Sequence, residues 1–221
     1  MNFPLDEVVV GVTDYLLALE CAFFAWALMT MRGGWRQMQH FFAAFFGVTA
    51  LASITGGTSH VFFPESTSLP ADVLWKATVV ALGGAAFAAW SVGATLLFAQ
   101  PTQRRIVLAA AIEFLIYGTY VVAIDDRFVL AIANYIPAAV FLAASFAVRY
   151  SRRREAPILS GLAGLAVTAI AAAVQRSGIA IHPLYFNHNA TYHAVQGIGF
   201  LLLFIAALLV ARVPAQVAKG E

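Results

Sequence analysis

Histidine is scarce in this chain, and most of its histidines fall where apolar segments begin or end. Only five occur in 221 residues, and three of them, His60, His188 and His193, stand at the ends of two long apolar runs. Zinc sites recruit neutral imidazole together with carboxylate, and catalytic sites keep three protein ligands and an open water position. Bound Zn²⁺ lowers the pKa of its water to about 7 and so supplies a hydroxide nucleophile. We therefore expect His60, His188 and His193 to hold Zn²⁺.

Two further residues are candidates for catalysis beside such a metal. Asp72 is expected either to act as general base or to orient a ligand histidine through a hydrogen bond. Ser59, next to His60, offers a hydroxyl that can hydrogen-bond the substrate or the bound water. The alternative for each histidine is a half-solvated residue at the membrane interface that needs no ligand, and we interpret His40 and His182 in that way.

The elements that must position these residues are membrane helices. Hydrophobic residues make up 62% of the chain and charged residues only 11%, and the mean hydropathy is +0.82. An ordinary soluble domain carries about a quarter charged residues, so a soluble globular enzyme is excluded. A membrane helix needs about 20 mostly apolar residues, and the chain has seven such runs. They cover about 8–30, 38–62, 72–99, 105–124, 128–149, 157–175 and 189–211.

The predicted fold class is all-α, a bundle of seven transmembrane helices in a single domain, residues 1–221. Helices are expected because backbone groups in lipid must be hydrogen-bonded internally and no alternating strand pattern appears. Basic residues set the orientation, since they concentrate in cytoplasmic loops. Three lie on one side, and ten lie on the other: Arg32, Arg36, Arg104, Arg105, Arg149, Arg152, Arg153, Arg154, Arg212 and Lys219. The N-terminus is therefore predicted outside and the C-terminus in the cytoplasm.

This orientation gathers the candidate residues near one membrane face. His60 ends a span that runs outward, whereas His188 and His193 begin one that runs inward, and Asp72 begins a span on that same outer face. Asp14 is expected about 9 Å below it at 1.5 Å per residue. Ionisable groups in a membrane span are costly and are functional candidates by default. Glu20 and Glu113 belong to this set but lie deeper.

Several classes of protein are excluded by the same inventory. The net charge of +2 and the lack of a basic stripe exclude a nucleic-acid partner, and Cys21 as the only cysteine excludes an intrachain disulfide. The only lysines, Lys76 and Lys219, are outside the last span, which excludes a retinal Schiff base there. The sequence has no internal repeat of the kind found in many transporters, which argues against a transporter. The acidic N-terminus, with Asp6 and Glu7, is unlike a cleaved secretory leader.

The arrangement resembles the superfamily of heptahelical membrane metal hydrolases known as CREST, which includes the alkaline ceramidases and the adiponectin and progestin receptors. The matching residues are Thr-Ser-His at 58–60, Asp72 and the stretch 186–193, Phe-Asn-His-Asn-Ala-Thr-Tyr-His. The resemblance implies zinc and cleavage of a lipid amide. His188 and His193 are five apart, about 140° on a helix. The third ligand position therefore falls either to Asn189, four residues before His193, or to His188 on non-helical backbone.

The predicted function is a zinc-dependent integral-membrane hydrolase of a lipid-like amide or ester, with its site in the outer leaflet of a bacterial inner membrane or plasma membrane. Membrane lipid and a lipid-like substrate are the expected partners. The resemblance also suggests Ca²⁺, through Asp6, Glu7 and Glu20. One alternative is a non-catalytic seven-helix protein that binds or senses lipid. A second is a haem protein in which two histidines such as His60 and His193 hold the iron.

Overall fold

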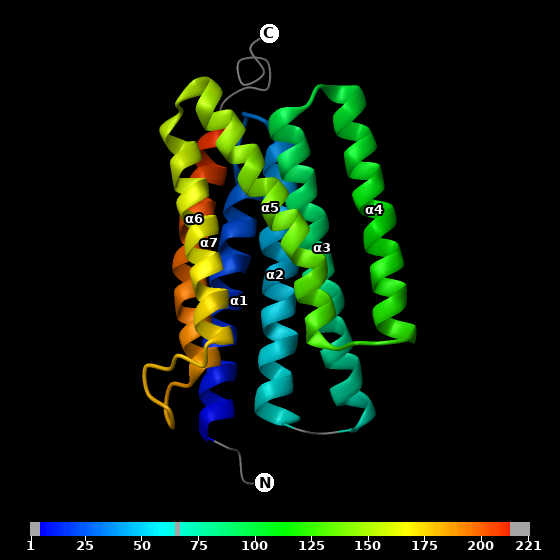
Figure 1. Ribbon diagram of the computed structural model, residues 1–221, viewed down its shortest axis with the longest axis vertical. Coiled ribbons are helices and arrows are strands. Elements are labelled where there is room, and N and C mark those ends of the chain that lie inside the picture. Colours follow the sequence, from blue (N-terminus) through cyan, green and yellow to red (C-terminus); the bar gives the residue numbers. More distant parts are fainter. Residues whose placement is uncertain (1–4, 65–66, 213–221) are drawn as a thin grey trace.

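The computed structural model describes residues 5–64 and 67–212, and these residues form seven long helices (Figure 1). All seven are long and apolar enough to cross a membrane, which confirms the predicted all-α bundle and makes this a multi-pass integral membrane protein. The helices are α1 (Leu5–Thr30), α2 (Arg36–Phe62), α3 (Leu69–Leu97), α4 (Gln100–Ala123), α5 (Phe128–Arg153), α6 (Ala156–Arg176) and α7 (His188–Arg212).

Six of the seven helices begin earlier than the sequence predicts, and three of these six have a proline in their first turn. Pro70, Pro101 and Pro157 separate the apolar runs in the sequence, but each lies in the first turn of a helix. Proline is tolerated there because the first backbone N–H groups of a helix have no intrahelical acceptor. The helix α4 therefore starts at Gln100 rather than near residue 105.

The bundle is built mainly from helices that follow one another in the chain, and α3 lies at its centre. Figure 1 shows α1 beginning at the end of the bundle opposite the one where α7 finishes. The helix α3 packs against α2, α4 and α5, whereas α4 packs mainly on α3 and leaves most of its surface to lipid. The helix α1 packs on both α2 and α7, so it joins the two ends of the chain. We call the end where α1 and α7 begin the outer end, following the predicted orientation.

An aromatic core fills the half of the contact between α1, α2 and α7 that lies away from the outer end. The rings of Phe24 and Phe204 stack with centroids 4.1 Å apart, and Phe46 meets Phe24 edge-on at 5.2 Å. All three are buried. Offset and edge-on aromatic pairs are favourable arrangements of ring quadrupoles. This half of the contact is closed by apolar packing, and the buried polar side chains of α1 and α7 lie in the outer half.

In the outer half, α1 and α2 approach each other closely. A Cβ atom at Gly57 would lie 2.8 Å from the Asp14 Cβ and 3.1 Å from the Gly11 carbonyl oxygen. Only glycine fits at position 57 with the helices at this separation. The Asp14 side chain is thereby held against α2 and inside the bundle, where it is 6% exposed.

Candidate functional site

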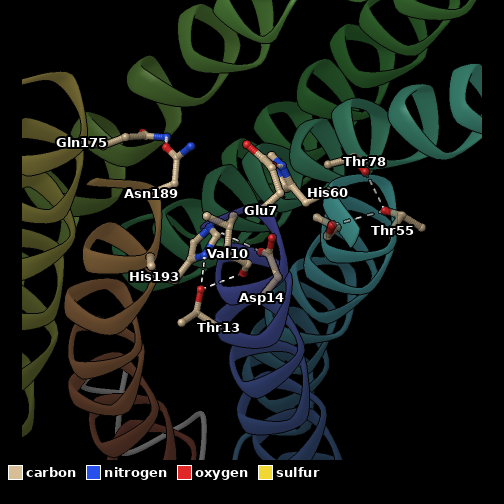
Figure 2. Close-up of polar contacts among 12 residues, drawn as sticks. Glu7, Val10, Thr13, Asp14, Thr55, His60, Thr78, Gln175, Asn189 and His193 are labelled. Carbon is tan, nitrogen blue, oxygen red and sulfur yellow. Dashed lines mark hydrogen bonds and ion pairs between the residues drawn. The ribbon is translucent and has the colours of Figure 1, made fainter. Parts of the chain in front are cut away.

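The outer half of the bundle contains a buried contact between an imidazole and a carboxylate. His193 Nε2 lies 3.3 Å from Asp14 Oδ1, and His193 Nδ1 lies 2.9 Å from the Thr13 hydroxyl (Figure 2). The side chains of His193 and Asp14 are 11% and 9% exposed. The helix α7 supplies the histidine in its second turn, and α1 supplies both of its partners. This contact connects the first helix to the last.

The hydrogen bonds around Thr13 determine which nitrogen of His193 carries a proton. The Thr13 hydroxyl has one hydrogen and donates it to the Val10 carbonyl oxygen at 2.7 Å. At the contact with His193, Thr13 therefore accepts, and Nδ1 carries the hydrogen. The facing atoms, His193 Nε2 and Asp14 Oδ1, then share one further proton. The pair is able to hold a proton in a region that lipid and helix packing keep nearly dry.

A second imidazole–carboxylate pair lies closer to the outer end. His60, in the last turn of α2, has its Nδ1 2.7 Å from Glu7 Oε2 in the first turn of α1 (Figure 2). Both side chains are about 30% exposed, with values of 31% for His60 and 29% for Glu7. Two of the three predicted metal ligands, His60 and His193, thus lie toward the same end of the bundle, and each has its own carboxylate.

The other predicted site residues have different surroundings. Asp72 forms an ion pair with Lys76 on the same helix, with Lys76 Nζ 2.8 Å from Asp72 Oδ1. Ser59 is half-buried, and its backbone carbonyl oxygen accepts a hydrogen bond from the Phe63 N–H at the end of α2. These contacts neither require nor test the catalytic roles predicted for Asp72 and Ser59.

The third predicted ligand lies away from His193 along α7. The helix begins at His188, so the five-residue spacing turns the two histidines about 140° apart. The alternative residue, Asn189, accepts a hydrogen bond from Gln175 Nε2 of α6 at 3.1 Å (Figure 2). Across residues 5–64 and 67–212, no three His, Cys, Asp or Glu side chains come together as a group able to hold a metal ion. Zinc at His60, His188 and His193 stays a prediction.

The calcium prediction is limited by the length of α1. Glu7 and Glu20 belong to the same continuous helix, thirteen residues apart, which is about 20 Å along its axis. Calcium ligands lie about 2.4 Å from the ion, so one Ca²⁺ cannot contact both carboxylates. Ca²⁺ binding by Asp6 and Glu7 alone stays a prediction.

A groove open to lipid runs between α1 and α7 beside the buried pair. Its volume is about 540 Å³, within the range of small-molecule sites. Apolar side chains dominate its walls, and three of them, Leu16, Ile198 and Leu201, are between 45% and 61% exposed. The lining residues are Thr13, Leu16, Leu17, Glu20, Phe186, His193, Ala194, Gly197, Ile198 and Leu201. The groove can therefore be entered sideways from the bilayer.

The sequence indicates some of these residues and misses others. Asp14 and Glu20 stand out as acids inside an apolar run, and His193 as a histidine at the start of one. Thr13 gives no comparable signal, because a threonine in a membrane span needs only its own helix as partner. The pairing of Asp14 with His193 and of Glu7 with His60 depends on which helices are neighbours. The spacing of residues in the sequence does not indicate which helices these are.

The fold and the site define a seven-helix integral membrane protein with histidine–carboxylate pairs near one face and a lipid-facing groove beside them. Residues 9–212 match a protein family described as a family of unknown function (DUF6962), and the chain belongs to this family. No curated protein and no solved structure matches the chain.

Proposed function

We propose that this protein binds a membrane amphiphile in the groove between α1 and α7 and acts as a lipid-binding or lipid-sensing protein. The observation that supports this most strongly is the groove itself. It has apolar walls open to the bilayer and three convergent polar side chains, Thr13, Glu20 and His193. Ligand sites typically combine an apolar lining with a few fixed polar groups. The expected location is a bacterial inner membrane or plasma membrane.

The groove shares a residue, His193, with the contact that joins α1 to α7, so this contact can respond to a bound ligand. His193 lines the groove and at the same time contacts Asp14 inside the bundle. An occupant that touches His193 alters the contact that joins α1 to α7. Ligand binding shifts a conformational equilibrium only through different contacts in the two states, and this contact supplies such a difference.

A bulky residue in the groove tests the proposal. Ala194 is exposed and lines the groove, so Ala194→Trp fills it with little effect on the bundle. In nanodiscs, a fatty alcohol with a photoreactive diazirine on its chain is expected to crosslink to α1 and α7 of the wild type. Ala194→Trp should reduce the crosslink yield at these helices about tenfold.

Ala133→Trp is the matched control. Ala133 is also an exposed alanine, and it lies in the second turn of α5 as Ala194 lies in the second turn of α7. Its crosslink yield at α1 and α7 should equal that of the wild type. Equal yields in wild type, Ala194→Trp and Ala133→Trp would show that the groove is not a binding site.

Zinc-dependent hydrolysis of a lipid amide or ester is the second candidate function. The two histidine–carboxylate pairs favour it, because a metal-ligating histidine commonly has its second nitrogen bonded to a carboxylate. The fit is incomplete, since both nitrogens of His193 already have partners and only Nε2 of His60 is open to a metal. Zinc, when bound, would supply an activated water.

Metal analysis separates this candidate from the first. A zinc hydrolase requires about one zinc per purified chain and its loss in His60→Ala, because His60 offers the one open imidazole nitrogen of the two pairs. A wild-type protein without stoichiometric zinc after purification in zinc-containing buffer contradicts the hydrolase. The haem alternative requires a Soret band in the absorption spectrum of the same sample.

A further inference from the structure

The deep end of the groove holds a carboxyl group with no protein partner. Glu20 is half-buried in α1 and makes no hydrogen bond or ion pair with any other described residue. No lysine or arginine lines the groove, so no cation is available to it there. An acid in a membrane span is costly and normally faces a partner or a water-filled cavity. We therefore expect a molecule bound in the groove to supply the hydrogen-bond partner of Glu20.

Helix geometry fixes how far Glu20 is from the polar outer end. Thr13 and Glu20 are seven residues apart on the continuous helix α1, which places them on nearly the same face and about 10 Å apart along the axis. Leu16 and Leu17 lie between them and line the groove. The groove thus has a polar group at each end and an apolar wall between.

The facing helix leaves room for the Glu20 carboxyl. A Cβ atom at Gly197 of α7 would lie 3.0 Å from Glu20 Oε2 and 3.7 Å from a Leu17 methyl carbon. Because position 197 has no side chain, the carboxyl lies against the α7 backbone and remains a lining group of the groove. Ile198 and Leu201 continue the apolar wall on this side.

We propose that the groove selects an amphiphile with two polar groups about 10 Å apart: a head group beside Thr13 and a hydroxyl on the hydrocarbon chain that hydrogen-bonds Glu20. The ligand class is a hydroxylated-chain lipid, and this inference rests on the proposed function of the groove. At the outer end the Thr13 hydroxyl oxygen has a second lone pair that accepts from the head group, since it donates to Val10 and accepts from His193. At the deep end a hydroxyl is able to donate to the carboxyl or to accept from it.

Paired alkanols and α,ω-alkanediols of increasing chain length test the two-point selection. Each compound competes with the diazirine fatty alcohol for crosslinking to the protein in nanodiscs. The diol whose hydroxyls are separated by about 10 Å should compete about tenfold better than the alkanol of the same length, because one additional buried hydrogen bond to a carboxyl is gained. Shorter and longer diols should lose this advantage.

Variants of Glu20 separate hydrogen bonding from other effects. Glu20→Leu removes the hydrogen-bonding group and should abolish the preference for the diol over the alkanol of the same length. Glu20→Gln keeps a donor and an acceptor at the same position and should retain the preference. Both variants are expected to fold, because Glu20 makes no contact with the bundle that a leucine or glutamine side chain would break.

Each result bears on a different statement. If diols and alkanols compete equally at every length, or if Glu20→Leu keeps the diol preference, the two-point selection is wrong and groove binding stands. If neither compound class competes and Ala194→Trp crosslinks like the wild type, the proposed function itself fails. A length-dependent diol preference that is lost in Glu20→Leu and kept in Glu20→Gln supports the hydroxylated-chain ligand.

Discussion

His193→Leu is expected to destabilise the protein by about 2–3 kcal/mol, the upper part of the range for leaving a buried polar group without its partner. The reason is the carboxyl group left behind, since Asp14 is 6% exposed and has His193 as its partner at 3.3 Å. Asp14→Val should cost less, about 1 kcal/mol, because His193 Nδ1 keeps its contact with the Thr13 hydroxyl. The free energy of unfolding in mixed detergent micelles measures both effects.

The double variant Asp14→Val/His193→Leu tests whether the two residues are energetically coupled. Replacing a buried polar pair by apolar residues of similar size is often neutral, so the double variant should be more stable than His193→Leu alone. The ion pair of Asp72 and Lys76 is the control, because Asp72 is 43% exposed and exposed pairs contribute about 1 kcal/mol or less. If the double variant loses the sum of the two single losses, Asp14 and His193 are not coupled.

Gly34→Ala is expected to reduce stability by about 2–5 kcal/mol, and Gly33→Ala by about 1–2 kcal/mol. Both glycines lie in the loop between α1 and α2 with positive φ, +73° for Gly33 and +74° for Gly34, so alanine is strained at either position. Only Gly34 also lies against another element. A Cβ atom there would overlap the Ala211 carbonyl oxygen, whereas one at Gly33 would meet nothing within 4 Å.

The structural reason for this difference lies at the end of α7. The last carbonyl groups of a helix lack intrahelical donors. The Ala211 carbonyl oxygen accepts a hydrogen bond from the Trp35 N–H at 2.8 Å, and the Gln39 side chain holds the loop through the Gly33 carbonyl oxygen at 2.6 Å. Thermal unfolding of the two glycine variants in the same detergent compares them directly. Equal losses would show that the loop does not pack on α7.

The sequence predicts the helices well because the membrane imposes a simple rule on them. Each span is a run of about 20 apolar residues, and all seven runs become helices near the predicted bounds. The largest error at the start of a helix occurs at Pro101, which acts as a first-turn residue and not as a break, as Pro70 does. Proline has both properties, and only the flanking structure distinguishes them.

The candidate site is predicted less completely, for a physical reason. Depth in the membrane follows from counting residues, so His60, His193 and Asp14 are correctly predicted to lie toward the same end of the bundle. Which side chains touch depends on the rotation of each helix and on its neighbours. Thr13 and Glu7 complete the two histidine contacts, and neither spacing nor residue type indicates that role.

The order in which the chain is made has a consequence for the contact between α1 and α7. Most neighbouring helices in this bundle are consecutive in the sequence and are able to pair as hairpins while synthesis continues. The helices α1 and α7 can pack together only after α7 has been synthesised and inserted. Until then Asp14 lacks His193 and the groove lacks one wall. The ligand binding that we propose therefore requires α7 to be inserted beside α1. A product that lacks α7 leaves Asp14, an ionisable group inside a membrane span, without its histidine partner.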